Sequence, residues 1–221
     1  MKVTLAVVLV LVFGIASAMP ASAELYIAGE LGYTMPRDFT DVKLNGAGTG
    51  VSSTDLKLGD GVMYGAKVGY YLPAALNWLG FETELYNANV HTKQQTVTVT
   101  GPGGTLTGTM PGSSLRGTVV ALNLMIRYPG SFLQPYVGAG PAVFFTRDKS
   151  AVASARDTSL GLNVLAGVRA MMTKNFGIFA EYKYNRTSVS YDNVVDPTAP
   201  GIGLEGDYSS NTVAVGVSFH F

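Results

Sequence analysis

The chain has 221 residues, of which 47% are hydrophobic, 10% aromatic and only 14% charged. Because average soluble proteins carry about 25% charged residues, this composition, with its 27 glycines, 12 tyrosines and 10 phenylalanines, predicts a β-rich protein whose exterior is unusually apolar or sheltered from water. The 15 basic and 15 acidic side chains balance, which argues against nucleic acid as a partner, and the lack of cysteine excludes disulfides, thiolate metal sites and cysteine nucleophiles.

The first segment has the pattern of a secretory signal peptide. Lys2 supplies a positive charge, an apolar stretch follows over residues 5–16, and residues 21–23 form a small-residue cleavage site. The apolar stretch is too short to span a bilayer, which takes about 20 residues. We therefore expect residues 1–23 to be cleaved on export and residues 24–221 to form one domain. The alternative is an anchor helix that is retained.

The rest of the chain alternates apolar and other residues with a period of two, which predicts β-strands with one apolar face. We expect eight strands, each of the 9–11 or so residues that a tilted transmembrane strand requires. In chain order, the alternating segments cover residues 25–34, 62–72, 79–85, 120–128, 137–145, 160–169, 176–184 and 212–221.

The connections between these segments alternate between short and long. Short turns are predicted at residues 73–77, 129–131 and 173–175, and long loops at residues 37–60, 93–115, 147–157 and 186–209. Outer-membrane barrels have short periplasmic turns and long extracellular loops, and an even number of strands puts both termini of the chain on one side. The order of the connections therefore favours a transmembrane barrel.

The second long loop has a strand pattern of its own. Two threonine-rich segments, 95–100 and 105–109, flank a turn of glycine and proline at 101–104. This pattern predicts a hairpin that projects beyond the bilayer. We expect a plain strand extension, and an adhesive or receptor role is the alternative.

Ionisable side chains fall on only one face of the predicted strands. Arg or Lys on a lipid-facing surface costs about 2–4 kcal/mol at the midplane, so an uncharged face on every strand is what lipid contact selects. The interior of an eight-stranded barrel is only wide enough for side chains to fill, and buried charges there need partners. We therefore predict a plugged lumen with a neutral charge network formed by Glu30, Lys67, Glu82, Glu84, Arg127, Arg169, Glu181 and Lys183. The alternative is a water-soluble barrel with these charges outside and an apolar cavity inside.

Aromatic residues are predicted to gather in two bands, as at the two interfaces of a membrane. The band near the short turns comprises Trp78, Tyr128, Phe132, Phe176, Phe219 and Phe221. The band toward the long loops comprises Tyr33, Tyr64, Phe145 and Tyr184.

The last alternating row consists of Val213, Val215, Val217, Phe219 and Phe221. This aromatic ending resembles the C-terminal assembly signal of bacterial outer-membrane barrels. Together with the leader and the first strand, it makes residues 24–221 similar to the small eight-stranded porin-family barrels of the OmpA-like and opacity-protein group. The resemblance implies an all-β, eight-stranded antiparallel up-and-down transmembrane β-barrel in the outer membrane of a Gram-negative cell envelope.

The resemblance also implies partners and a range of functions. Expected partners are outer-membrane lipids and lipopolysaccharide, the barrel assembly machinery through the C-terminal strand, and a surface ligand at the long loops. Members of the group serve as envelope anchors, adhesins or narrow channels. The working hypothesis is a monomeric barrel with an envelope-structural or surface-interaction role, and the alternative is a narrow small-solute channel similar to OmpW-like porins.

A lipid-modifying enzyme is the third hypothesis, because some eight-stranded barrels modify lipid A. A hydrolase needs a nucleophile held by a histidine and an acid. Only His91 and His220 are present, they are predicted near opposite ends of the barrel, and no His-x-Ser pair occurs. Glu82 and Glu84 lie two apart on one face, which suits salt bridges better than paired catalytic acids. We therefore expect no catalytic residues, no cofactor and no metal.

Overall fold

The computed structural model describes residues 24–37, 40–45, 52–53, 58–92, 95–101, 104–110, 113–149, 156–191 and 203–221. The expected signal peptide, residues 1–23, lies outside these ranges. Within the ranges, no helix has the length and apolar character needed to cross a bilayer.

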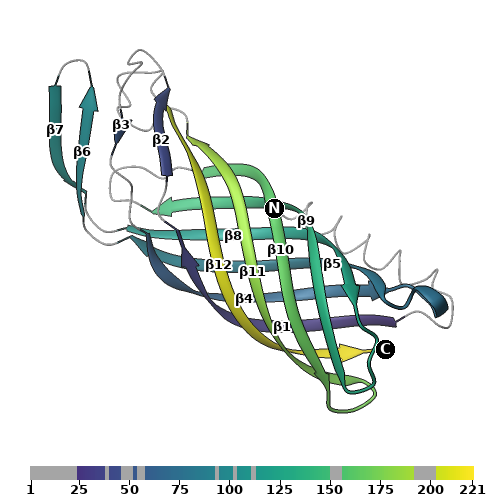
Figure 1. Ribbon diagram of the computed structural model, residues 1–221. Coiled ribbons are helices and arrows are strands. Elements are labelled where there is room, and N and C mark those ends of the chain that lie inside the picture. Colours follow the sequence, from purple (N-terminus) through teal and green to yellow (C-terminus); the bar gives the residue numbers. More distant parts are fainter. Residues whose placement is uncertain are drawn as a thin grey trace.

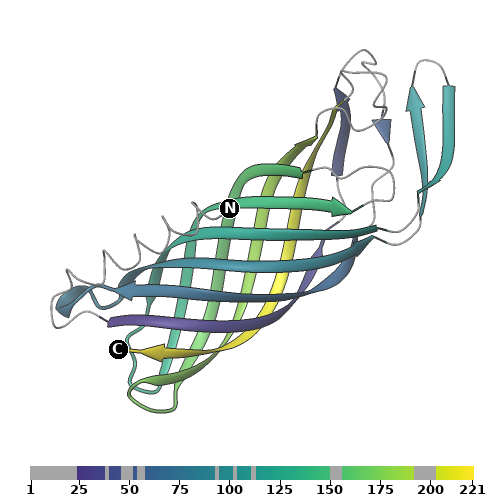
Figure 2. The ribbon, with the colours of Figure 1, turned by 180° about the vertical axis from the view of Figure 1, so that it is seen from behind.

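Eight long antiparallel strands roll into a closed barrel (Figures 1 and 2). Each strand pairs with its neighbours in chain order, and the first pairs with the last, which closes the ring. The structure thus confirms the predicted eight-stranded up-and-down barrel. Its strands are β1 (Glu24–Pro36), β4 (Leu58–Tyr71), β5 (Leu79–Thr92), β8 (Ser113–Arg127), β9 (Leu133–Lys149), β10 (Arg156–Met171), β11 (Phe176–Tyr191) and β12 (Gly203–His220).

Side chains alternate between the inside and the outside of the barrel. The neighbours Glu30 and Leu31 of β1 are 4% and 63% exposed, and the same period of two runs through the other barrel strands. Aliphatic and aromatic side chains therefore form an apolar belt on the outside, while the lumen is filled by polar and small side chains together with buried apolar ones such as Met63, Met125 and Leu165. The predicted faces are confirmed in the described residues. The predicted aromatics are exposed as well, except Tyr184, which is half-buried.

The two ends of the barrel differ in their connections. At one end, here called the short-turn end, the strands join through residues 72–78, which include the short 3-10 helix η1 (Ala74–Leu76), and through residues 128–132 and 172–175. These positions confirm the predicted short turns. β1 begins and β12 finishes at this same end, because Tyr26 pairs with His220.

At the opposite end, here called the long-loop end, the strands run further than the sequence predicted. The pairing of β11 with β12 continues from Arg186 opposite Ser209 to Tyr191 opposite Leu204, inside the predicted loop 186–209. β9 and β10 likewise extend into the predicted loop 147–157. The loops predicted at residues 147–157 and 186–209 were therefore too long. The strands keep pairing beyond the last apolar residue of the outward row, so the end of that row does not mark the end of the strand.

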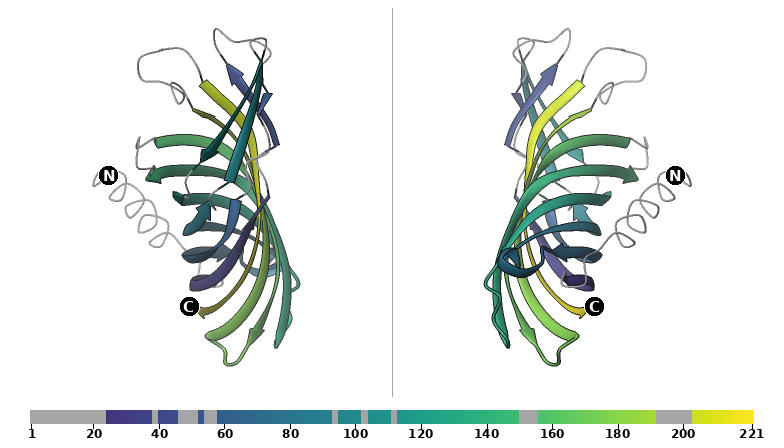
Figure 3. Two further views of the ribbon diagram at one scale, coloured as in Figure 1. Left: turned by 90° about the vertical axis from the view of Figure 1, so that its left-hand side faces the viewer. Right: turned by 90° about the vertical axis from the view of Figure 1, so that its right-hand side faces the viewer.

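Four further strands extend the sheet beyond the barrel at the long-loop end (Figure 3). They continue from β12 in the order β12-β2-β3-β6-β7, and comprise β2 (Thr40–Asn45), β3 (Ser52–Ser53), β6 (Gln95–Gly101) and β7 (Gly104–Met110). The pairing of β6 with β7 confirms the predicted hairpin. β2 and β3 are not among the predicted strands, because β2 is held by the distant β12 and β3 by β6 as well as β2.

The apolar belt leads to the first testable prediction. Leu124 lies outward in the apolar row of β8, between Leu122 and Ile126, and is 47% exposed. A charged group at such a position costs about 2–4 kcal/mol in lipid, so Leu124→Arg is expected to block assembly into the membrane. The measurement is the heat-dependent migration of the membrane fraction on SDS gels, and Leu124→Met serves as the uncharged control. Normal assembly of the Arg variant would contradict the assignment of the two faces.

Candidate functional site

The lumen holds all eight ionisable residues that the strand pattern assigned to it. Each is at most 5% exposed, although together they contribute four carboxylates, two ammonium groups and two guanidinium groups. Charges so deeply buried need partners, because transfer out of water costs each of them several kcal/mol. The residues are Glu30, Lys67, Glu82, Glu84, Arg127, Arg169, Glu181 and Lys183.

Lys67 of β4 joins three acids from three other strands. Its Nζ donates to both oxygens of Glu181, at 2.7 and 2.9 Å, and to Oε1 of Glu82 at 3.2 Å. It also lies 3.6 Å from Oε2 of Glu30. One ammonium group therefore links β4 with β1, β5 and β11.

Lys183 of β11 makes a second group of contacts with the same acids. Its Nζ forms ion pairs with Oε1 of Glu30 and Oε1 of Glu84, and lies 3.5 Å from Oε1 of Glu181. β5 and β11 stand four places apart in a ring of eight, so the pair of Lys183 with Glu84 joins opposite walls. These two lysines and their four acids are called the central cluster: Glu30, Lys67, Glu82, Glu84, Glu181 and Lys183.

Tyrosines link the central cluster to Arg169. The hydroxyl of Tyr26 donates to Oε2 of Glu82 at 2.5 Å, and that of Tyr136 to Oε2 of Glu181 at 2.8 Å. The guanidinium of Arg169 lies over the same two rings, 4.4 Å from the centre of Tyr26 and 5.4 Å from that of Tyr136. Such cation–π contacts are strongest where the cation is shielded from water. Arg169 thus places a positive charge beside the central cluster. It contacts the cluster through the two tyrosine rings whose hydroxyls bind Glu82 and Glu181.

Glycines make room for these rings. A Cβ atom at Gly69 would lie 2.2 Å from the ring of Tyr26, and one at Gly167 would lie 2.6 Å from Tyr136. Both distances are far inside van der Waals contact, so a side chain at either position would displace a tyrosine that holds an acid of the cluster.

Arg127 lies apart from the central cluster, at the short-turn end. It forms two parallel hydrogen bonds to Glu24, at 2.7 and 2.5 Å, and stacks on Tyr71 with 3.7 Å to the ring centre. Bidentate pairs of this kind fix geometry as well as charge. The structure therefore divides the eight predicted residues into the six of the central cluster, Arg169 beside them, and Arg127 with Glu24.

Glu24 also begins a hydrogen-bonded chain along the seam between the first and last strands. Its Oε1 lies 2.6 Å from Nδ1 of His220, whose Nε2 lies 2.9 Å from the Oγ of Ser218. The order of serine, histidine and acid is that of a hydrolytic triad. Here Ser218 is only 2% exposed, which leaves no room for a substrate in this conformation.

Several further lumen residues share the inward parity of the eight predicted ones, although they are not among the predicted site residues. Glu24 has the parity of Glu30, but as the first residue after the expected cleavage site it is not among the eight predicted residues. Tyr26 and Tyr136 share the inward parity of their strands, and Ser218 shares that of His220. Their hydroxyls carry no formal charge, so a search for ionisable residues overlooked them.

The central cluster has more acids than bases, which raises the question of a metal ion. Glu30, Glu84 and Glu181 each place one carboxylate oxygen within 4.8 Å of the others. The ammonium group of Lys183 forms ion pairs with all three. The positive charge that a metal would supply is therefore provided by a lysine.

The comparisons with known proteins agree with this architecture. The family described as outer membrane protein beta-barrel domain matches residues 6–221. No curated protein matches the sequence.

Three solved structures illustrate the likeness of the fold. Neisserial surface protein A is 17% identical, with a TM-score of 0.57, and the match covers 89% of this chain and 97% of that one. The outer membrane protein OprG from Pseudomonas aeruginosa is 18% identical, with a TM-score of 0.63 and coverage of 90% and 96%. The outer membrane protein AlkL is 13% identical, with a TM-score of 0.53 and coverage of 92% and 93%.

The ion pairs of Lys183 lead to a prediction on stability. Lys183→Met would leave Glu84 without the ammonium group that it pairs with and Glu30 with only Lys67 at 3.6 Å, and breaking a buried pair in this way costs about 3–5 kcal/mol. The folded band on unheated SDS gels should therefore convert to the unfolded band at a lower temperature than in the wild type. Lys174→Met, which changes an exposed lysine in a short turn, is the control and should behave as the wild type.

A second substitution distinguishes the loss of the ion pair from the loss of packing around the lysine side chain. Adding Glu84→Gln to Lys183→Met removes one of the carboxylates left alone and should restore part of the lost stability. A Lys183→Met variant as stable as the wild type would contradict the role given to this ion pair.

Proposed function

Since the chain belongs to the family of outer membrane protein β-barrel domains, and so to the bacterial outer membrane, we propose that it is a plugged barrel with an envelope-structural or surface-interaction role. The observation that carries this proposal is the central cluster. Its ion pairs run from Lys67 and Lys183 to acids on other walls of the lumen, so a solute would have to break them to pass. A barrel of eight strands has little interior space to spare beyond its own side chains.

The strands beyond the barrel support a role at the cell surface. Short turns lie on the periplasmic side of such barrels, which puts the long-loop end and its four additional strands outside the cell. In the β6–β7 hairpin, the register pairs threonine with threonine three times: Thr96 with Thr109, Thr98 with Thr107, and Thr100 with Thr105. No ionisable residue occurs from residue 95 to residue 110. A surface ligand would therefore meet hydroxyl and backbone groups here, without steering by charge.

We also propose a mode of export, partners and an oligomeric state that suit a barrel of the outer membrane. Residues 1–23 serve as an export signal that is cleaved before Glu24, and residues 24–221 form the mature barrel. Its partners are outer-membrane lipids and lipopolysaccharide, and the barrel assembly machinery, which recognises the last strand through Val213, Val215, Val217, Phe219 and Phe221. The barrel acts as a monomer.

Conductance in planar bilayers tests the proposal against its main alternative, a narrow small-solute channel. The wild type is expected to give no steady current, because the central cluster crosses the lumen. Lys67→Ala removes the ammonium group that joins three acids and should admit measurable current, whereas Lys174→Ala should remain silent. Steady ion-selective current from the wild type would favour the channel.

The hydrogen-bonded row of Ser218, His220 and Glu24 is the observation that favours the alternative of an enzyme. Because Ser218 is buried, we expect no labelling by a fluorophosphonate probe and no change in the mass profile of lipid A when the wild type is overexpressed. Ser218→Ala is the matched control. Labelling of the wild type, or a lipid A change that this variant abolishes, would favour a hydrolase.

A further inference from the structure

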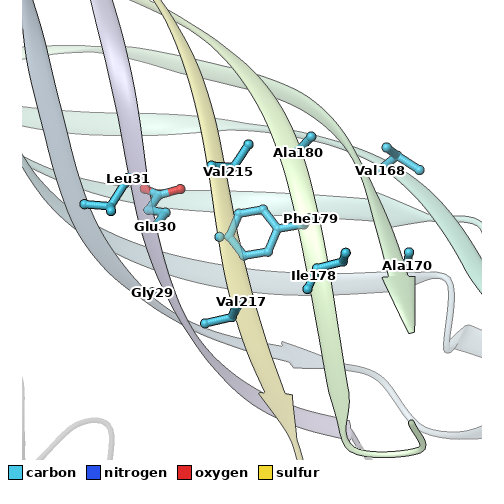
Figure 4. A pocket seen from close by; sticks show the side chains of 11 residues that line it. Gly29, Glu30, Leu31, Val168, Ala170, Ile178, Phe179, Ala180, Val215 and Val217 are labelled. Carbon is cyan, nitrogen blue, oxygen red and sulfur yellow. The ribbon is translucent and has the colours of Figure 1, made fainter. Parts of the chain in front are cut away.

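The outer wall of the barrel carries an apolar groove of about 690 Å³ that crosses β1, β12, β11 and β10 (Figure 4). Its sides are outward aliphatic residues that belong to the apolar belt, among them Leu31, Ile178, Val215 and Val217. The groove is therefore continuous with the surface that lipid covers in the membrane.

Small residues make this part of the wall hollow. Gly29, Ala170 and Ala180 line the groove among larger outward neighbours. A Cβ atom at Gly29 would meet nothing within 4 Å, whereas one at Gly69 would collide with an inward tyrosine. Packing of the barrel does not require a glycine at position 29, so its effect is to leave space on the outside.

The groove begins in the periplasmic leaflet of the membrane: on β10, β11 and β12 it lies near the short-turn end, whereas on β1 it reaches Leu31, two residues from Tyr33 of the other aromatic band. Ile178 is two residues from Phe176 at the start of β11, and Val217 is two residues from Phe219 near the finish of β12. Both phenylalanines are exposed and lie at the short-turn end, where the aromatic band marks the interface. The lipids of this leaflet are phospholipids, so their acyl chains are the hydrocarbon at this level.

The wall beneath the groove is thin over the central cluster. In the pairing of β1 with β12, Gly29 stands opposite Val217 and Glu30 stands opposite Gly216. Glu30 points inward, yet it also lines the groove, and its Oε2 accepts no hydrogen bond from the described residues. Hydrocarbon over this spot would keep water away from the ion pair of Glu30 with Lys183, which strengthens that pair.

We propose that the groove is a binding site for one acyl chain of a phospholipid from the periplasmic leaflet, which seals the wall over the central cluster. The aliphatic lining of the groove matches a hydrocarbon chain. The site depends on the outer-membrane setting but not on whether the barrel is a structural protein or a channel.

Native mass spectrometry of the full barrel tests the site, with the protein released from detergent after incubation with phospholipid or with lipopolysaccharide. The wild type should retain one phospholipid and no lipopolysaccharide. Gly29→Leu and Ala180→Leu fill the groove from two strands and should lose the phospholipid. Ala139→Leu adds the same side chain at an exposed position of β9 outside the groove and should keep it.

Several outcomes would overturn the proposal. These are a wild type that retains no phospholipid, retention by both groove variants, or loss by the control as well. A dimer that disappears in the groove variants would show that a second copy of the chain occupies the groove instead. Heat-dependent migration identifies any variant that fails to fold, and the other groove variant then decides the result. A silent or conducting wild type in planar bilayers leaves this test unaffected.

Discussion

Charged groups can remain inside a narrow barrel only when each finds a partner across the lumen. That requirement shapes the interior from one end to the other. Lys67 and Lys183 bridge acids from β1, β5 and β11, Arg127 pairs with Glu24, and Arg169 rests on tyrosine rings. A residue added to this set without a partner would bear the full cost of desolvation. The walls are thus held by links between distant strands as well as by the backbone ladder.

The same constraint explains why the lumen combines very small and very large side chains. Long Lys, Arg, Glu and Tyr side chains reach to the middle, and glycines such as Gly69 and Gly167 leave the space that the aromatic rings occupy. On the outside the requirement is reversed, since lipid accepts any aliphatic shape and excludes charge. Two alternating rows along one strand meet both requirements at once.

This alternation is also why much of the fold could be predicted from the sequence. A period of two with charges on one row only is a local signal, so the eight strands, their faces and the short turns could be located without tertiary information. β2 and β3 could not, because their pairing depends on partners far away in the chain. The division of the lumen charges into the central cluster and the pair of Arg127 with Glu24 could not be predicted either. Arg127 and Lys67 both point inward, and only the stagger of the strands puts one beside Glu24 and the other beside Glu181.

The seam between β1 and β12 bears on how the barrel can form. Its hydrogen bond from His220 to Glu24 joins groups 196 positions apart, and the eleven backbone partners beside it are almost as distant. Loops of this length close slowly, and contacts of high sequence separation slow folding. The ring cannot be completed until both of its outermost strands are present together, so before closure the facing edges of β1 and β12 are unpaired. Unpaired strand edges are templates for pairing with other chains, so closure of this seam also removes the site at which the sheet could aggregate.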